Sequence, residues 1–177
     1  MNDKDILVIH PYLKKKRINK DYFLEEAINL VKAINLNCID SLLVGLDTIS
    51  PKTYLNKGFI RKIKLEARNY KVDLLLINTT LSPIQQRNLE KDLNCKVLDR
   101  TNLILEIFGS RAKSNEGKLS VTLASLEYQK SRLVRSWTHL ERQRGGAGFM
   151  GGPGEKQIES DRRQITERIN RLKKKIK

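Results

Sequence analysis

Six of the ten glycines in this 177-residue chain lie between Gly145 and Gly154, and this segment separates two long stretches of helical periodicity. Glycine brings no side chain to bury and loses much backbone entropy when it is ordered, so the segment adds nothing to a core. Phe149 and Met150 stand at its centre. We therefore expect a loop that joins two helices and presents one aromatic and one thioether side chain at its tip.

Apolar residues flank the glycines at alternating steps of four and three residues, a spacing typical of a coiled-coil seam. Before the loop these residues are Leu119, Leu123, Leu126, Leu133, Trp137 and Leu140, with Lys130 at the one missing position. After the loop they are Ile158, Ile165, Ile169, Leu172 and Ile176. We predict a long antiparallel two-helix hairpin, a coiled coil, in which the numbers of facing residues sum to about 299.

The first part of the chain alternates short apolar runs with helical patterns, which predicts an α/β fold with a small parallel sheet flanked by helices. The predicted strands are residues 6–9, 41–46, 73–78 and 96–98, and the predicted helices start at Asp21, near Ile60, at Ser82–Pro83 and at Thr101. Asp21 is the expected N-cap of the first helix, and His10–Pro11 is expected to end the first strand. The unbroken apolar run around Leu74–Ile77 indicates burial on both sheet faces. The predicted domains are residues 1–112 and 113–177, with the tip loop at 145–154.

The net charge of +15 and the pI near 9.9 favour a polyanionic partner, either nucleic acid or an anionic membrane surface. Residues 113–177 contain 16 basic and 7 acidic residues. A solvated coiled-coil face would carry the two signs in balance, and here the balance is missing.

Several classes of function find no support in the residues. No apolar run reaches the roughly 18 residues of a membrane span, and the N-terminus lacks the features of a signal peptide, so a cytosolic protein is expected. Cys38 and Cys95 are expected to be buried, reduced thiols, and His10 a structural or surface histidine. The first 112 residues contain no catalytic triad, metal cluster or phosphate loop. We expect no cofactor in this chain.

Three motif interpretations apply to the loop. Gly146–Gly151 matches the GxGxxG string of dinucleotide-binding proteins, but it follows a helix instead of a strand. Gly154–Gln157 lacks the spacing and the hydroxyl of a Walker phosphate loop. The third interpretation is RNA binding, in which glycine amides approach the RNA backbone and Phe149 stacks on a base; a plain connector remains the alternative. The candidate RNA-binding residues are Arg132, Arg135, Arg142, Arg144, Gly145, Gly146, Gly148, Phe149, Met150, Gly151, Gly152, Gly154, Lys156, Arg162 and Arg163.

Particular stretches of the chain resemble the HflX family of GTPases. These are Trp137–Gln143, the glycine loop with Gly152–Arg163, and the shorter stretches Leu81–Leu89 and Asp99–Leu105. The resemblance is extended and specific from about residue 70 to 177. Before residue 70 it is weak, and Tyr54–Gly58 departs from the family's usual glycine-lysine-glycine-like segment.

The resemblance implies an N-terminal α/β subdomain and a helical hairpin that precede a GTPase domain. It also implies binding to rRNA of the large ribosomal subunit, with the glycine loop near the peptidyl transferase centre, and separation or rescue of ribosomes. No GxxxxGK[ST] motif is present, so GTP and Mg²⁺ are implied only for the GTPase domain, and this chain is not expected to hydrolyse GTP alone. A monomer is expected. The alternatives are a nucleotide-binding regulatory or enzymatic α/β domain and a coiled-coil protein-interaction module.

Overall fold

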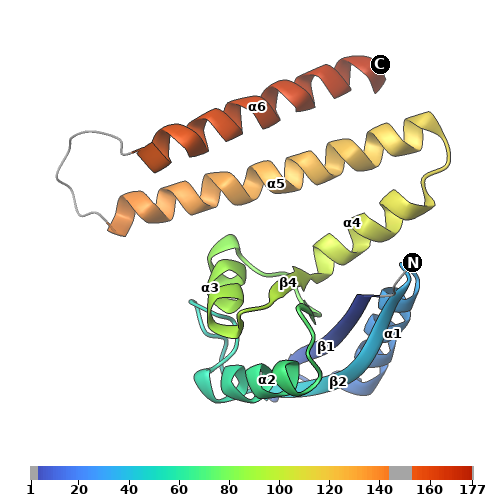
Figure 1. Cartoon of the computed structure of the whole chain (residues 1–177), viewed down its shortest axis with the longest axis vertical. Helices are drawn as coiled ribbons and strands as arrows, with labels where there is room; N and C mark the ends of the chain where they lie inside the picture. Colours follow the sequence, from blue (N-terminus) through green and yellow to red (C-terminus); the bar gives the residue numbers. More distant parts are fainter. Residues whose placement is uncertain (1–3, 144–152, 177) are drawn as a thin grey trace. The chain divides into compact units, whose positions relative to one another are not determined.

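The computed structural model describes the backbone of residues 4–143 and 153–176, and the side chains of residues 4–132 and 160–175 (Figure 1). These residues belong to two compact units, Met1–Ser110 and Arg111–Lys177. The first unit contains a sheet with helices, and the second contains two long helices.

Strands and helices alternate along the first unit, which confirms the predicted α/β class. The strands are β1 (Lys4–Leu13), β2 (Leu36–Leu46), β3 (Leu74–Ile77) and β4 (Lys96–Asp99). The helices are α1 (Lys20–Lys32), α2 (Lys57–Asn69), α3 (Pro83–Leu93) and α4 (Arg100–Arg111). Every strand pair is parallel, and the order across the sheet is β2-β1-β3-β4. The strand nearest the N-terminus therefore lies inside the sheet.

Both faces of the sheet are buried, as the unbroken apolar runs predict. Leu7 and Ile9 of β1 pack in one cluster with residues of α2 and α3. Their neighbours Ile6 and Val8 pack in a second cluster with residues of α1 and α4. Because successive side chains of a strand point to opposite faces, this split follows directly from the sequence order. All four side chains have no exposed surface, so β1 is the centre of the core.

The predictions for the end of β1 and for the N-cap of α1 were wrong. His10–Pro11 does not end β1, which continues to Leu13. The β1–β3 pairing stops at Ile9, whose carbonyl faces β3 and accepts from the Asn78 amide. The backbone nitrogen of Pro11 points to the same side of β1 as the Ile9 carbonyl, and β3 has already ended there. The missing N–H of proline therefore removes no hydrogen bond between strands.

The N-cap of α1 is Asn19 and not Asp21. The Asn19 side chain accepts a hydrogen bond from the Tyr22 amide at 3.1 Å, and Asp21 lies in the first turn. The predicted start of α3 is confirmed, because Ser82 and Gln85 form a reciprocal capping box with Pro83 in the first turn.

The second unit consists of α5 (Asn115–Gln143) and α6 (Pro153–Ile176), which run in opposite directions and contact each other (Figure 1). Among the described side chains of these helices, Leu126 and Ile169 are the buried ones, at 8% and 4% exposure. Both belong to the predicted apolar stripes. Lys173 and Glu127 form an ion pair of 2.8 Å between the helices, and their numbers sum to 300, close to the predicted register.

Candidate nucleic-acid interface

The described part of α6 carries an excess of exposed cations. The exposed ones are Arg162, Arg163, Arg168, Arg171, Lys173, Lys174 and Lys175. Asp161 and Glu167 are the only carboxylates between residues 160 and 175. Glu167 lies within 3.4 Å of Arg163 and 3.6 Å of Arg171, one turn away on either side. One carboxylate shared by two guanidinium groups leaves a net positive helix face, which suits phosphate groups.

Arg132 of α5 lies in a different environment. Its guanidinium stacks over the Tyr128 ring at 4.4 Å and donates a hydrogen bond to the Tyr128 hydroxyl. The side chain is half-buried. A cation held on an aromatic face loses conformational freedom, so Arg132 is more restricted than the exposed side chains of Arg162 and Arg163.

The side chains of the other predicted RNA-binding residues lie outside the described part of the structure. Arg135, Arg142, Gly154 and Lys156 lie in α5 and α6, where the structure describes the backbone alone. The remaining ones, Arg144, Gly145, Gly146, Gly148, Phe149, Met150, Gly151 and Gly152, lie outside the described residues. The same holds for the side chain of Trp137. The structure thus brings Arg162 and Arg163 together on α6 and leaves the tip of the hairpin as a sequence-based prediction.

A buried polar network, which is absent from the sequence-based predictions, lies at the carboxyl ends of β1, β3 and β4. The Asn78 side-chain amide donates to His10 Nδ1 at 3.1 Å and to the Phe23 carbonyl at 3.0 Å. Arg100 donates to Asn78 Oδ1 at 2.9 Å and to Glu26 Oε1 at 2.8 Å. One asparagine therefore links two strands to helix α1.

The signal that indicates this network is present in the sequence. Asn78 and Arg100 each follow directly after a buried parallel strand, and the carboxyl ends of such strands meet at one edge of the sheet. Asp99 at the end of β4 is fully buried, and its carboxylate accepts from the backbone amides of Leu81 and Asn102 at 3.2 and 2.8 Å. These side chains connect the loops at this edge.

His10 is a structural histidine, as expected, with 6% of its surface exposed. Its ring stacks on Phe23 with 5.9 Å between centroids. Within the described part of the chain, Nε2 has no hydrogen-bond partner. Burial lowers the pKa of the imidazole from 6.5; the positive charge of Arg100 adds to this effect, while the Asn78 hydrogen bond and the Glu26 charge oppose it.

Lowering the pH from about 7.5 to 5.5 is expected to destabilise the first unit through His10. The folded state favours the neutral imidazole, so its contribution to stability is complete above the unfolded pKa of 6.5 and is lost as the pH falls through the lowered folded pKa. Urea unfolding at the two pH values measures the difference.

The matched variants for this measurement are His10→Asn, which should remove most of the pH dependence, and His139→Asn, which replaces the other histidine of the chain. An equal pH dependence in wild type and His10→Asn would contradict the assignment.

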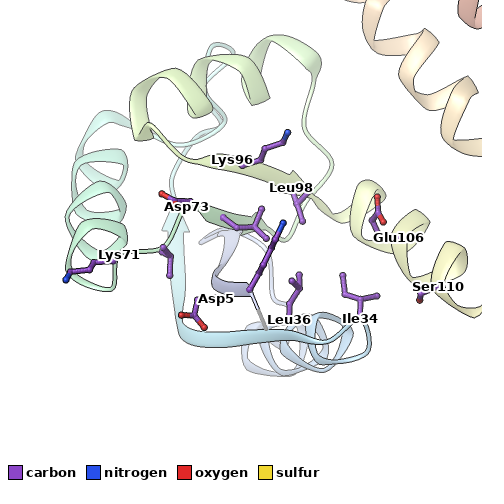
Figure 2. Close-up of a pocket in the computed structure, with 12 residues that line it drawn as sticks. Asp5, Ile34, Leu36, Lys71, Asp73, Lys96, Leu98, Glu106 and Ser110 are labelled. Atoms are coloured by element: carbon purple, nitrogen blue, oxygen red, sulfur yellow. The ribbon is translucent and has the colours of Figure 1, made fainter. Parts of the chain in front are cut away.

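A cavity of about 810 Å³ lies at the opposite edge of the sheet, at the amino ends of the strands (Figure 2). Its polar rim consists of Lys4, Lys71, Lys96, Asp5, Asp73, Glu106 and Ser110, and its apolar residues are Ile34, Leu36, Val72, Leu74 and Leu98. Open parallel sheets bind nucleotides at the carboxyl ends of their strands, which is the other edge. Three lysines balanced by three carboxylates also give no net attraction for a polyphosphate.

Cys38 and Cys95 are free and half-buried, and burial raises the pKa of both thiols. Among the described residues, no cluster of histidine, cysteine, aspartate and glutamate is arranged to hold a metal ion. No helix in the described ranges is both long and apolar enough to cross a membrane.

Two family models match the chain. The model described as GTP-binding GTPase N-terminal matches residues 21–109, and the model described as GTP-binding GTPase Middle Region matches residues 111–177. The GTPase HflX of Magnetococcus marinus is 53% identical over 153 residues, which cover 86% of this chain and 35% of the relative. The GTPase HflX of Escherichia coli is 38% identical over 170 residues, covering 96% and 39%. The chain spans little more than a third of the length of these relatives.

Solved structures resemble the fold. A GTP-binding protein from the hyperthermophilic archaeon Sulfolobus solfataricus, in complex with GDP, superposes with a TM-score of 0.65 at 24% identity, covering 98% of this chain and 44% of that one. The SsGBP and GDP complex gives a TM-score of 0.69, also at 24% identity, covering 98% and 43%. At this identity the similarity shows the fold alone.

Proposed function

The chain belongs to the HflX family of GTP-binding GTPases, and from this membership we propose that it is the RNA-binding part of an HflX-like protein that acts on the large ribosomal subunit. The partner is rRNA, contacted by the cations of α5 and α6. GTP and Mg²⁺ would bind to the GTPase domain of the whole protein. Hydrolysis of GTP by that domain would be coupled to splitting or rescue of ribosomes. The protein acts in the cytoplasm.

The exposed cationic face of α6 is the observation that carries the proposal. Between residues 160 and 175 seven cations are exposed, and Glu167 is already shared by Arg163 and Arg171. The ion pair between Lys173 and Glu127 uses one more cation to join the helices. The remaining positive charges are available to phosphates, which dominate the affinity of proteins for nucleic acids.

The length of the hairpin determines how far its cationic surface can extend. We infer that α5 and α6 form an antiparallel coiled coil along the stripes that contain Leu126 and Ile169, both of which are buried. A helix of 29 residues is about 43 Å long at 1.5 Å per residue. Such a hairpin would place residues 144–152, which join α5 to α6, well away from its base. The glycines let the loop follow a confined RNA surface near the peptidyl transferase centre, where Phe149 stacks on a base.

Replacing Phe149 and Met150 by alanine is expected to weaken binding to purified large subunits by about 5- to 150-fold. This factor corresponds to the 1 to 3 kcal/mol that stacking of one base on an aromatic ring contributes. Sedimentation of the full chain with large subunits measures the affinity. Phe108→Ala is the matched control, since Phe108 is an aromatic residue of the first unit with 58% exposure.

Three outcomes would count against the proposal. Unchanged affinity of the Phe149 and Met150 double variant would reduce the loop to a connector. Retention of a cellular partner after complete nuclease digestion would instead favour a coiled-coil protein-interaction module, and tight binding of ATP or GTP by this chain would favour a nucleotide-binding α/β domain.

A further inference from the structure

The loop between β1 and α1 carries four consecutive exposed cations, Lys14, Lys15, Lys16 and Arg17. It leaves the sheet at the carboxyl end of β1, where Leu13 pairs with Leu46 of β2. Lys14 is paired with Asp47 at 3.1 Å, which fixes the start of the loop to the end of β2. Within the described structure, Lys15, Lys16 and Arg17 have no carboxylate in ion-pair distance.

Exposed apolar side chains follow these cations at once. Ile18, Tyr22 and Phe23 are 39%, 59% and 38% exposed. The described part of the chain has eight large hydrophobic residues of this exposure, and three of them fall within six positions. Scattered single residues of this kind are normal on protein surfaces, but a local group of them marks a contact surface.

The two aromatic rings of this group are held in place. Phe23 stacks on the buried ring of His10, and Tyr22 meets Phe23 edge to face with 5.7 Å between centroids. The first turn of α1 is fixed by the Asn19 cap. Tyr22 therefore presents an aromatic face that is more than half exposed and already ordered, so a stacking partner does not have to immobilise it.

We propose that this surface, residues 14–20 with Tyr22 and Phe23, is a second RNA-binding site that takes single-stranded RNA. The nucleobase stacks on Tyr22, and Lys15, Lys16 and Arg17 contact the phosphates on either side. Cations next to ordered, exposed aromatic rings are the combination by which proteins bind unpaired strands. The site lies in the first unit and does not depend on the function proposed for the hairpin.

Titration of a fluorescent oligouridylate of about 12 nucleotides with the full chain tests the site. Tyr22→Ala is expected to weaken binding by about 5- to 150-fold, the range measured for loss of one base stack. The triple variant Lys15→Ala, Lys16→Ala, Arg17→Ala is expected to lower the slope of log affinity against log salt by about 2, because each phosphate contact to a single strand contributes about 0.7.

Matched control variants distinguish binding at this site from a non-specific effect of positive charge. Tyr70→Ala removes a tyrosine of 42% exposure elsewhere in the same unit. The triple variant Arg61→Ala, Lys62→Ala, Arg68→Ala removes three exposed cations from α2. Both should bind the oligouridylate like wild type. Equal losses in the control and test variants, or full binding by Tyr22→Ala, would overturn the proposal.

The experiments distinguish failure of this RNA-binding proposal from failure of the function proposed for the hairpin. Alanine at Phe149 and Met150 should leave oligouridylate binding to the Tyr22 surface unchanged, while Tyr22→Ala should weaken it by the factor given above. If Tyr22→Ala instead abolishes binding to phosphatidylserine vesicles and leaves RNA binding intact, the surface is a lipid site and the RNA proposal is wrong.

Discussion

Raising the salt concentration from about 50 to 200 mM is expected to weaken binding of this chain to large ribosomal subunits by about 900- to 6,000-fold. The estimate takes seven neutralised phosphates, one for each predicted cationic contact: Arg132, Arg135, Arg142, Arg144, Lys156, Arg162 and Arg163. Each phosphate releases counterions and contributes about 0.7 to 0.9 to the slope of log affinity against log salt. Sedimentation over a series of KCl concentrations at constant Mg²⁺ measures this slope.

Variants in α6 test which cations contribute to the salt dependence. Replacing Arg162 and Arg163 by glutamine should lower the slope by about 1.4 to 1.8 units. Replacing Lys62 and Lys91, two exposed lysines of the first unit, should leave it unchanged. A wild-type slope below about 1 would mean that phosphates contribute little, and the RNA-binding assignment of the hairpin would then fail.

Removing the Asn78 side chain is expected to lower the free energy of unfolding of the first unit by about 2 to 4 kcal/mol. Asn78→Ala takes one partner from His10 and one from Arg100, and it removes a donor to the Phe23 carbonyl. A polar group that is left buried without a partner costs about 1 to 3 kcal/mol. Urea unfolding followed through the NMR signals of the buried methyl groups reports on this unit.

Asn37→Ala is the control for the asparagine experiment. Asn37 also donates one side-chain hydrogen bond, at 2.9 Å to Asp5, but it is exposed. Its removal should change the stability by no more than about 0.5 kcal/mol. Equal effects at Asn78 and Asn37 would show that the polar network at the carboxyl edge does not stabilise the fold.

The sequence predicted those elements whose burial is complete. The run at β3 is apolar at every position because both faces of the sheet are covered, so its pattern is unambiguous. The start of β2 was predicted at Ser41, five residues after its true start at Leu36. Asn37 and Ile39 are exposed there, since β2 is an edge strand. Exposed and half-buried residues alternate in this part of β2, so it has no continuous apolar run that would mark a strand.

The sequence indicates which residues lie at the carboxyl edge of the sheet, but the hydrogen-bond partners within the polar network could not be predicted. His10 and Asn78 are 68 positions apart, and only the order β2-β1-β3-β4 brings them together. Residue spacing carries no information on sheet order. The exposure of Arg163 was predictable, because a helix places its own residues on known faces and Arg163 lies outside the apolar stripe. Arg162 occupies the stripe position between Ile158 and Ile165, so the stripe alone does not predict its exposure.

The position of β1 in the sheet has a consequence for how the chain is made. Leu7 pairs with Leu75, so β1 is synthesised 68 residues before this partner strand. Until then, β1 has only β2 beside it, and the apolar surface that α4 covers stays open to solvent. Nascent chains with such surface are prone to aggregate. The first unit therefore cannot complete its core until synthesis has passed β4 and α4.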